Sequence, residues 1–214
     1  MGSGSKPVSL ETKKDSLSYA IGTDMARSLS TVREEIDIDV LIGGMKDQLD
    51  SNALQIDRAA AQKIVREFST QMRQRQQEKN QKAAVANKEE GRMFLEENGK
   101  KEGVVTTASG LQYMVLKQGD GPKPKSTDRV TVHYRGTTID GTEFDSSYGR
   151  GEPTTFGVSG VIKGWSEALQ LMNVGSKYKL FIPSELAYGQ RGAGQKIGPN
   201  AVLIFEVELL DIVK

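Results

Sequence analysis

The sequence predicts an α+β protein in which a C-terminal antiparallel β-sheet wraps on one short helix and is joined by a long helix to an all-α N-terminal domain. Three observations lead to this prediction. Apolar residues recur at helical spacing before residue 57, a polar and proline-free segment follows, and strand patterns separated by Gly, Pro, Asn and Asp begin near residue 103. We expect a helical domain over residues 6–56, a connecting helix over 57–100 and the β domain over 101–214.

Two short amphipathic helices are predicted in the N-terminal domain. Their apolar positions repeat at steps of three and four: Leu17, Ala20, Ile21 and Met25 in the first, and Val40, Leu41, Met45 and Leu49 in the second. We expect Asp15 to cap the first helix, and Asp37 or Asp39 to cap the second. The pair Gly43-Gly44 lowers helix propensity and indicates close packing of another helix.

One long helix is predicted from Asp57, its N-cap, to Asn98, where Asn98-Gly99 stops it. Its first part has an apolar edge at four-residue steps: Ile64, Phe68 and Met72. The stretch RQRQQEKNQK that follows is polar on every face, and apolar residues return at 93–95. At about 1.5 Å per residue such a helix reaches roughly 60 Å, so we expect an arm between the two domains.

The remaining segment has four strand candidates and one helix. The strand candidates are residues 111–118, 130–139, 176–182 and 201–213, and the second of them is followed by the hairpin signal Asp140-Gly141. Within 162–172, one helical face carries Trp165, Ala168, Leu169 and Met172.

Composition argues against several classes of function. With 29 basic and 28 acidic residues the net charge is +1, so no overall field attracts nucleic acid or an anionic membrane. The absence of cysteine excludes disulfides, thiolate catalysis and cysteine metal sites. No apolar run is long enough to span a bilayer. The opening MGSGS, residues 1–5, is typical of a cloning remnant, and a signal peptide removed before Lys6 is compatible with this sequence.

Covalent, metal and phosphoryl chemistry are poorly supported. The single histidine, His133, alternates with Val132 and Tyr134 along a strand, so we expect it on the opposite, solvent-facing side. No serine lies in a nucleophile-elbow context, and the glycine-rich GQRGAGQ lacks the Gly-Lys-Ser/Thr of a phosphate loop. We expect no metal and no cofactor.

Aromatic residues of the C-terminal segment occur at irregular intervals, each beside a turn signal or a polar group. They are Tyr134, Phe144, Phe156, Trp165, Tyr188 and Phe205. This spacing matches neither a helix nor a strand face, so the rings are predicted to converge on one apolar pocket. Such a pocket, without any nucleophile, can still accelerate rotation about an X-Pro peptide bond by favouring the twisted amide over the planar one.

Four blocks carry a family resemblance: VTVHYRGTTIDGTEFDSSYGRGEPTTF, GVIKGWSEAL, PSELAYG and LIFEVELL. In order and spacing they resemble the signature blocks of the FKBP-type peptidyl-prolyl cis-trans isomerases. The segment DSLSYAIGTDMARSL and the long helix ending in FLEENGKKEGV are similar to the dimeric Mip and FkpA branch of Gram-negative bacteria.

The resemblance implies a role for each site residue. Trp165 would form the floor of a proline slot, and the walls would be Tyr134, Phe144, Phe156, Val161, Ile162 and Phe205. The Ile162 N–H and the Tyr188 hydroxyl would donate hydrogen bonds to the substrate. Asp145 would lie at the rim, Arg150 would pair with it or with Tyr134, and Arg150 and Ile197 would contact the substrate. Thr154, Ala193 and Lys196 depart from residues common in the family, and we expect activity to survive these changes.

The resemblance also implies partners and a location. It implies a V-shaped homodimer, held by the N-terminal helices, that isomerises proline-containing unfolded polypeptides, acts as a chaperone and binds macrolides of the FK506/rapamycin type. It favours the periplasm or outer envelope of a Gram-negative bacterium, with the cytoplasm as the alternative. Two other interpretations stay open: a module that binds proline segments without turnover, and N-terminal helices that serve only as a spacer or assembly device.

Overall fold

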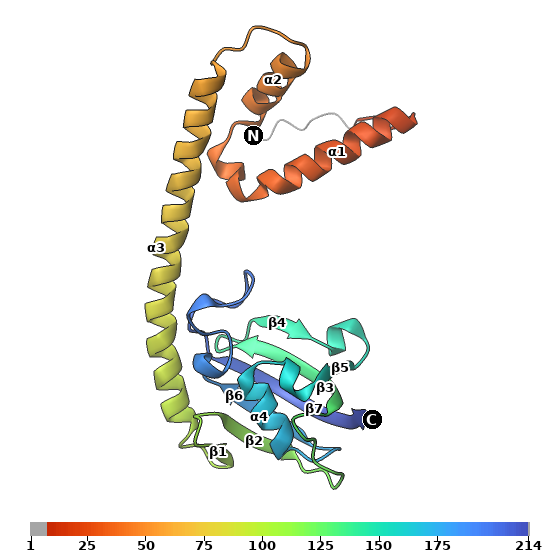
Figure 1. Ribbon diagram of the computed structural model, residues 1–214, viewed down its shortest axis with the longest axis vertical. Coiled ribbons are helices and arrows are strands. Elements are labelled where there is room, and N and C mark those ends of the chain that lie inside the picture. The colour runs from red at the N-terminus through yellow and green to blue at the C-terminus, as the bar shows by residue number, and fades with distance from the viewer. Residues whose placement is uncertain (1–7, 214) are drawn as a thin grey trace. The chain divides into compact units, whose positions relative to one another are not determined.

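The computed structural model describes residues 8–213, which form two compact units (Figure 1). The first unit ends at Phe68 and the second begins at Ser69. The expected cloning remnant at residues 1–5 lies outside the described range. Within that range, none of the helices is both long and apolar enough to cross a membrane.

The first unit contains the two predicted short helices, α1 (Lys13–Leu29) and α2 (Ile38–Leu49), joined by the 3₁₀ helix η1 (Ser30–Glu35). Asp15 does not cap α1, and that prediction is wrong. Thr12 is the cap: its hydroxyl accepts the Asp15 N–H at 3.1 Å, and the Asp15 carboxylate accepts the Thr12 N–H at 2.8 Å. This reciprocal pair is a capping box, in which the acidic residue occupies the third helical position rather than the cap.

Helix α2 begins after Asp37, one of the two predicted caps. The Asp37 carboxylate accepts the N–H groups of Asp39 and Val40 at 2.9 and 3.1 Å. Neither α1 nor α2 contains a buried residue, so their apolar faces lie open to solvent in the single chain.

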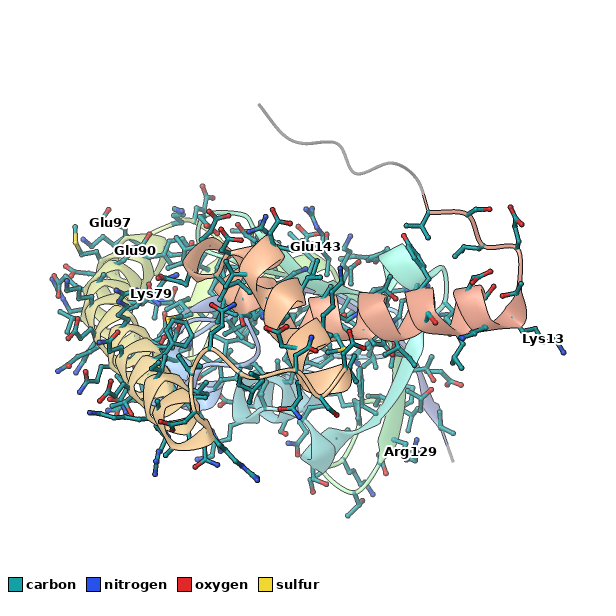
Figure 2. All side chains as sticks on the ribbon, turned by 90° about the horizontal axis from the view of Figure 1, so that it is seen from above. Lys13, Lys79, Glu90, Glu97, Arg129 and Glu143 are labelled. Carbon is teal, nitrogen blue, oxygen red and sulfur yellow. The ribbon has the colours of Figure 1, made fainter. Side chains whose placement is uncertain are left out.

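Helix α3 (Arg58–Asn98) begins and ends where the sequence predicts. The Asp57 carboxylate accepts the Ala60 N–H at 2.8 Å, and Gly99 follows the last helical residue. Charged side chains such as Lys79, Glu90 and Glu97 extend outward from this helix (Figure 2).

The second unit is built on a seven-stranded antiparallel sheet. Its strands are β1 (Val104–Thr106), β2 (Gln112–Lys117), β3 (Arg129–Thr138), β4 (Glu143–Ser146), β5 (Thr154–Gly157), β6 (Lys177–Ile182) and β7 (Leu203–Val213). The order is β1-β2-β6-β7-β3-β4, and β5 also pairs with β3. All four predicted strands are present, whereas β1, β4 and β5 have only three or four residues and were not predicted. The predicted hairpin is confirmed: Thr138 N–H bonds Thr142 O at 3.0 Å, and Gly141 adopts φ 84°.

Helix α4 (Lys163–Leu171) packs on one face of this sheet and closes the core (Figure 1). Its predicted face, Trp165, Ala168, Leu169 and the following Met172, is at most 4% exposed. A Cβ on Gly164 would lie 2.5 Å from Ile182 Cγ2, so glycine is required for the close approach of α4 to β6. The sheet contributes buried Val130, Val132, Leu180, Leu203, Val207 and Leu209.

The last turns of α3 pack against the sheet and belong to the second unit. The rings of Phe94 and Phe181 on β6 are 6.0 Å apart. Gln112 on β2 donates to Leu95 O at 2.8 Å and accepts from the buried Asn98 side chain at 2.9 Å. This packing accounts for the return of the apolar residues Phe94 and Leu95 after the polar middle of the helix, whereas Met93 is exposed.

Candidate active site

The predicted aromatic residues line one pocket of about 790 Å³ in the second unit. Every residue predicted as catalytic contributes to it, together with Ile197. The lining residues are Tyr134, Phe144, Asp145, Phe156, Gly160, Val161, Ile162, Trp165, Tyr188, Ala193, Gly194, Gln195, Lys196, Ile197 and Phe205. Arg150 is not among them, and Gly160, Gly194 and Gln195 were not anticipated from the sequence.

Trp165 is the centre of the aromatic cluster. It lies in the first turn of α4, is 4% exposed, and meets three rings edge-on. Its centroid is 5.2 Å from that of Tyr134, 5.8 Å from Phe156 and 5.2 Å from Phe205, with interplanar angles of 83–90°. Edge-to-face contacts add about 0.5–1.5 kcal/mol each to the burial of the rings, so the cluster holds the indole in one orientation.

Gly136 makes the cluster possible and was missed in the sequence. It lies in β3, where its Cα partners are Phe205 on β7 and Asp145 on β4. A Cβ at this position would lie 2.7 Å from ring atoms of both Phe144 and Phe205. A lone glycine within a strand pattern indicates close approach of neighbouring groups, and this signal in VTVHYRG could have identified it.

A polar network lies at the rim of the pocket. Tyr134 donates its hydroxyl to Asp145 Oδ2 at 2.5 Å, and Arg150 donates to Asp145 Oδ1 at 2.7 Å. Arg150 also donates to the Tyr134 hydroxyl at 2.9 Å and to Thr154 Oγ1 at 3.1 Å. Arg150 therefore pairs with both of its predicted partners, and its role here is to hold Asp145 and Tyr134 in place.

The network shifts the pKa values of its members in opposite directions. Burial raises the pKa of Asp145, but hydrogen bonds from Tyr134 and Arg150 and the guanidinium charge outweigh it, so the pKa lies below its usual value. Burial, followed by the hydrogen bond to Asp145, raises the pKa of Tyr134 above that of an ordinary phenol. Asp145 is thus an acceptor and Tyr134 a neutral donor over a wide pH range.

This arrangement predicts a flat pH profile for pocket function between about pH 5 and about pH 9. Because the pKa of Asp145 is lowered, its ionised form stabilises the site at every pH above the ordinary pKa of an aspartate. This stabilisation is lost as the pH falls through the lowered pKa. Because the pKa of Tyr134 is raised, its neutral form stabilises the site at every pH below the ordinary pKa of a phenol. This stabilisation is lost as the pH rises through the raised pKa. The check is kcat/KM for a proline peptide against pH. Asp145→Asn is expected to remove the acid limb, and Asp140→Asn, in the β3–β4 turn, to leave it unchanged.

Two hydrogen-bond donors belong to residues that line the pocket and have no acceptor in the described part of the chain. Within residues 8–213, neither the Ile162 N–H nor the Tyr188 hydroxyl has a hydrogen-bond partner. Ile162 caps α4, and its carbonyl accepts the N–H groups of Trp165 and Ser166. The backbone turn that positions the indole therefore also directs the Ile162 N–H. Trp165 Nε1, which is buried, also has no hydrogen-bond partner among the described residues.

One wall of the pocket is a single loop, residues 188–198, which we call the flap. It contains the 3₁₀ turn Gly189–Arg191 and an isolated bridge between Ala193 and Ile197. From the flap, Lys196 donates a hydrogen bond from Nζ to the main-chain oxygen of Glu143 on β4 at 3.2 Å. The flap supplies Tyr188 and Ile197 to the pocket, so its position determines the width of the site.

His133 lies on the face of β3 opposite Tyr134, as alternation predicts, but it is not solvent-facing. Its ring is half-buried and stacks on Tyr148 at 4.7 Å, and its Nδ1 is 2.9 Å from Ser147 Oγ. The turn that contains Tyr148 covers this strand face, which local alternation does not reveal. Over residues 8–213, no group of three or more His, Cys, Asp or Glu could hold a metal ion.

Comparisons with known proteins match both parts of the chain. The family described as FKBP-type peptidyl-prolyl cis-trans isomerase matches residues 121–210, and the domain amino terminal to it matches residues 14–115. The FKBP-type 22 kDa peptidyl-prolyl cis-trans isomerase of Escherichia coli K12 is 47% identical over 203 residues, covering 94% of this chain and 97% of that protein. The outer membrane protein MIP of Legionella longbeachae is 43% identical over 206 residues, covering 96% and 88%.

A solved structure extends the similarity to the fold. The crystal structure of FkpA from Escherichia coli has a TM-score of 0.69 and 37% sequence identity, covering 95% of this chain and 98% of that one. The sequence matches and the structural match both include the N-terminal helices and the sheet that carries the aromatic pocket. The chain belongs to the family of FKBP-type peptidyl-prolyl cis-trans isomerases.

Proposed function

We propose that the aromatic pocket catalyses cis/trans isomerisation of X-Pro bonds in unfolded polypeptides, without any covalent step. The observation that supports this most directly is the set of rings held edge-on around Trp165, beside two donors that have no acceptor among residues 8–213. A pyrrolidine ring would lie on the indole, between Tyr134, Phe156 and Phe205. The same slot would accept macrolides of the FK506/rapamycin type.

The chemistry follows from the electronic structure of the amide. Rotation crosses a barrier of about 18–20 kcal/mol because resonance is lost at the twisted midpoint. The planar, charge-separated form is stabilised by polar solvation, so an apolar pocket weakens that resonance. The Ile162 N–H and the Tyr188 hydroxyl would bond carbonyl groups of the peptide and fix it in a twisted geometry. Catalysis then arises from tighter binding of the twisted amide than of either planar form.

Trp165→Leu tests the site assignment. Losing the ring contacts of the floor is expected to lower kcat/KM for a proline tetrapeptide by about 10- to 100-fold, since each factor of ten corresponds to 1.36 kcal/mol. Tyr113→Leu is the matched control, because Tyr113 stacks on Tyr178 at 5.4 Å, and neither ring lines the pocket. Equal turnover in both variants and the parent would show that the pocket is not the site. Retained peptide affinity without turnover in the parent would identify a binding module.

We propose that residues 6–56 form a dimerisation domain, residues 57–100 a connecting helix and residues 101–214 the isomerase domain. Apolar side chains of α1 and α2, together with Ile36 between them, line a hollow of about 830 Å³ in the first unit, among them Ile21, Met25, Val40 and Met45. Monomeric proteins rarely expose such a continuous apolar surface, and a second copy would cover it. The methionines suit an adaptable interface.

A dimer would carry two pockets on one body and so bind an unfolded chain bivalently, which is the basis we propose for chaperone activity. Such linkage raises avidity by about 10²–10⁴ without any new contact. We place the protein in the periplasm or outer envelope, supported by the name of the Legionella longbeachae relative. Fractionation of the source cells, with the protein detected by antibody, tests that location.

A further inference from the structure

The flap is held at its base by Asn200, a residue outside the pocket. Asn200 adopts φ 57°, a left-handed conformation that asparagine tolerates better than most residues. Its backbone N–H donates to Gly189 O at 2.8 Å, directly after the pocket residue Tyr188. Asn200 thereby ties the end of the flap to its beginning.

The same residue connects the flap to helix α3. The Asn200 side chain donates from Nδ2 to Ala84 O at 3.0 Å. One helical turn further along, Asn87 Nδ2 donates to Pro199 O at 2.8 Å. Two side-chain amides, one from each element, thus bond main-chain carbonyls of the other, across 116 and 112 residues of sequence.

Close packing reinforces these two bonds. Gly91 is buried, and a Cβ there would lie 2.8 Å from Val202 Cγ2. Gly198, at the end of the flap, also lies close to the helix, because its Cβ would be 3.0 Å from Asn87 Nδ2. The helix is in turn fixed to the sheet by Phe94 and Asn98. The base of the flap therefore rests on a rigid support that is independent of the pocket walls.

From this geometry we infer that Asn87 and Asn200 are positioning residues for the isomerase site, and that α3 sets the position of the flap. The inference rests on the function proposed for the pocket. Tyr188 and Ile197 reach the substrate only from the flap, so loosening its base displaces one donor and one wall together. The connecting helix is then part of the working site as well as a link between domains.

Two substitutions remove the bonds, and the first of them also adds a negative charge, which its control shares. Asn87→Asp keeps the size of the side chain but replaces the donor to Pro199 O by an oxygen that cannot donate. Asn200→Gly keeps the left-handed backbone and its bond to Gly189 while deleting the bond to Ala84 O. Asn80→Asp is the matched control: it lies about two turns earlier on the same face of α3, and its side-chain oxygen accepts a hydrogen bond from Gln76 within the helix.

The full-length variants are compared in three measurements. Both flap variants are expected to lower kcat/KM for a proline tetrapeptide by about 3- to 10-fold, mainly through KM, because the donors are displaced rather than removed. The emission of Trp165, the chain's one tryptophan, should shift to the red as water enters the pocket. Amide hydrogen exchange should accelerate over residues 188–200. The double variant should lose little more than the worse single one, because both bonds hold the same joint.

The inference is overturned if both variants match Asn80→Asp in kcat, KM, Trp165 emission and exchange over residues 188–200, whatever happens to the unfolding midpoint. Failure of the proposed function looks different. In that case the parent shows no turnover, or Trp165→Leu leaves it intact, while emission and exchange still report whether α3 holds the flap.

Discussion

Gly136→Val is expected to lower kcat/KM for a proline peptide by at least about 100-fold, which corresponds to roughly 2.7 kcal/mol. The new Cβ would begin 2.7 Å from ring atoms of Phe144 and Phe205, and valine adds two methyl groups beyond it. Both contacts are with the far ends of side chains, so the rings can move. The space open to them is the pocket itself, and the proline slot would fill with the protein's own aromatic groups.

The effect on stability is expected to be smaller than the effect on activity. Overpacking of this kind costs about 1–3 kcal/mol, and urea unfolding measures it separately from turnover. Gly157→Val is the matched control: Gly157 lies in β5 opposite Arg129, at the end of β3 remote from Gly136, with extended backbone and, apart from its chain neighbours, no described atom within 4 Å of its Cβ position. A Gly136→Val protein that turns over peptide like the parent would show that Phe144 and Phe205 do not shape the site.

The elements found correctly in the sequence are those with enough residues to show a period. The alternation of apolar and polar residues continues over six or more residues in strands β3, β6 and β7. The helical period continues over more than two turns in α4, and its buried face is the predicted one. Strands β1, β4 and β5 are too short to show alternation, and they form because β2 or β3 offers an edge. Pairing of this kind depends on tertiary structure rather than on local sequence.

The residues of the site also fall into those that local sequence reveals and those that it does not. The pocket aromatics could be picked out because each lies beside a turn signal and within a block that resembles the family. The support of the flap could not, because Asn87 and Asn200 are polar residues of ordinary appearance, one in a helix and one in a loop. Their bonds join segments 112 and 116 residues apart, and no local pattern encodes such a contact. Gly136 is the intermediate case, since a glycine within a strand is a visible signal that can be read only when its neighbours are known.

Val40→Asp is expected to convert the proposed dimer into a monomer, raising the dissociation constant by at least about 100-fold, because an unpaired charge in a covered apolar surface costs several kcal/mol. Val40 is 73% exposed in the single chain and lies in the first turn of α2. An acidic residue there suits the helix dipole, so the substitution should not harm an isolated chain. Any loss of assembly can then be assigned to the surface that a second copy covers.

Ile42→Asp provides the control for this surface. Ile42 is 43% exposed on the same helix but does not line the apolar hollow, and it points about 200° away from Val40 around the axis. Light scattering should report one chain for Val40→Asp and two for Ile42→Asp. The rate of tetrapeptide turnover per chain should be equal in the two variants, because each pocket lies entirely within the second unit of one chain.

The decisive comparison uses a long, unfolded client with several prolines. If two linked pockets hold such a chain bivalently, Val40→Asp should slow its assisted refolding by at least about tenfold while leaving the tetrapeptide reaction unchanged. Loss of both reactions would instead mean that the substitution damages the pocket. If Val40→Asp remains a dimer, the hollow is not the interface. If Ile42→Asp also dissociates, the helices associate through a wider surface than the one assigned here.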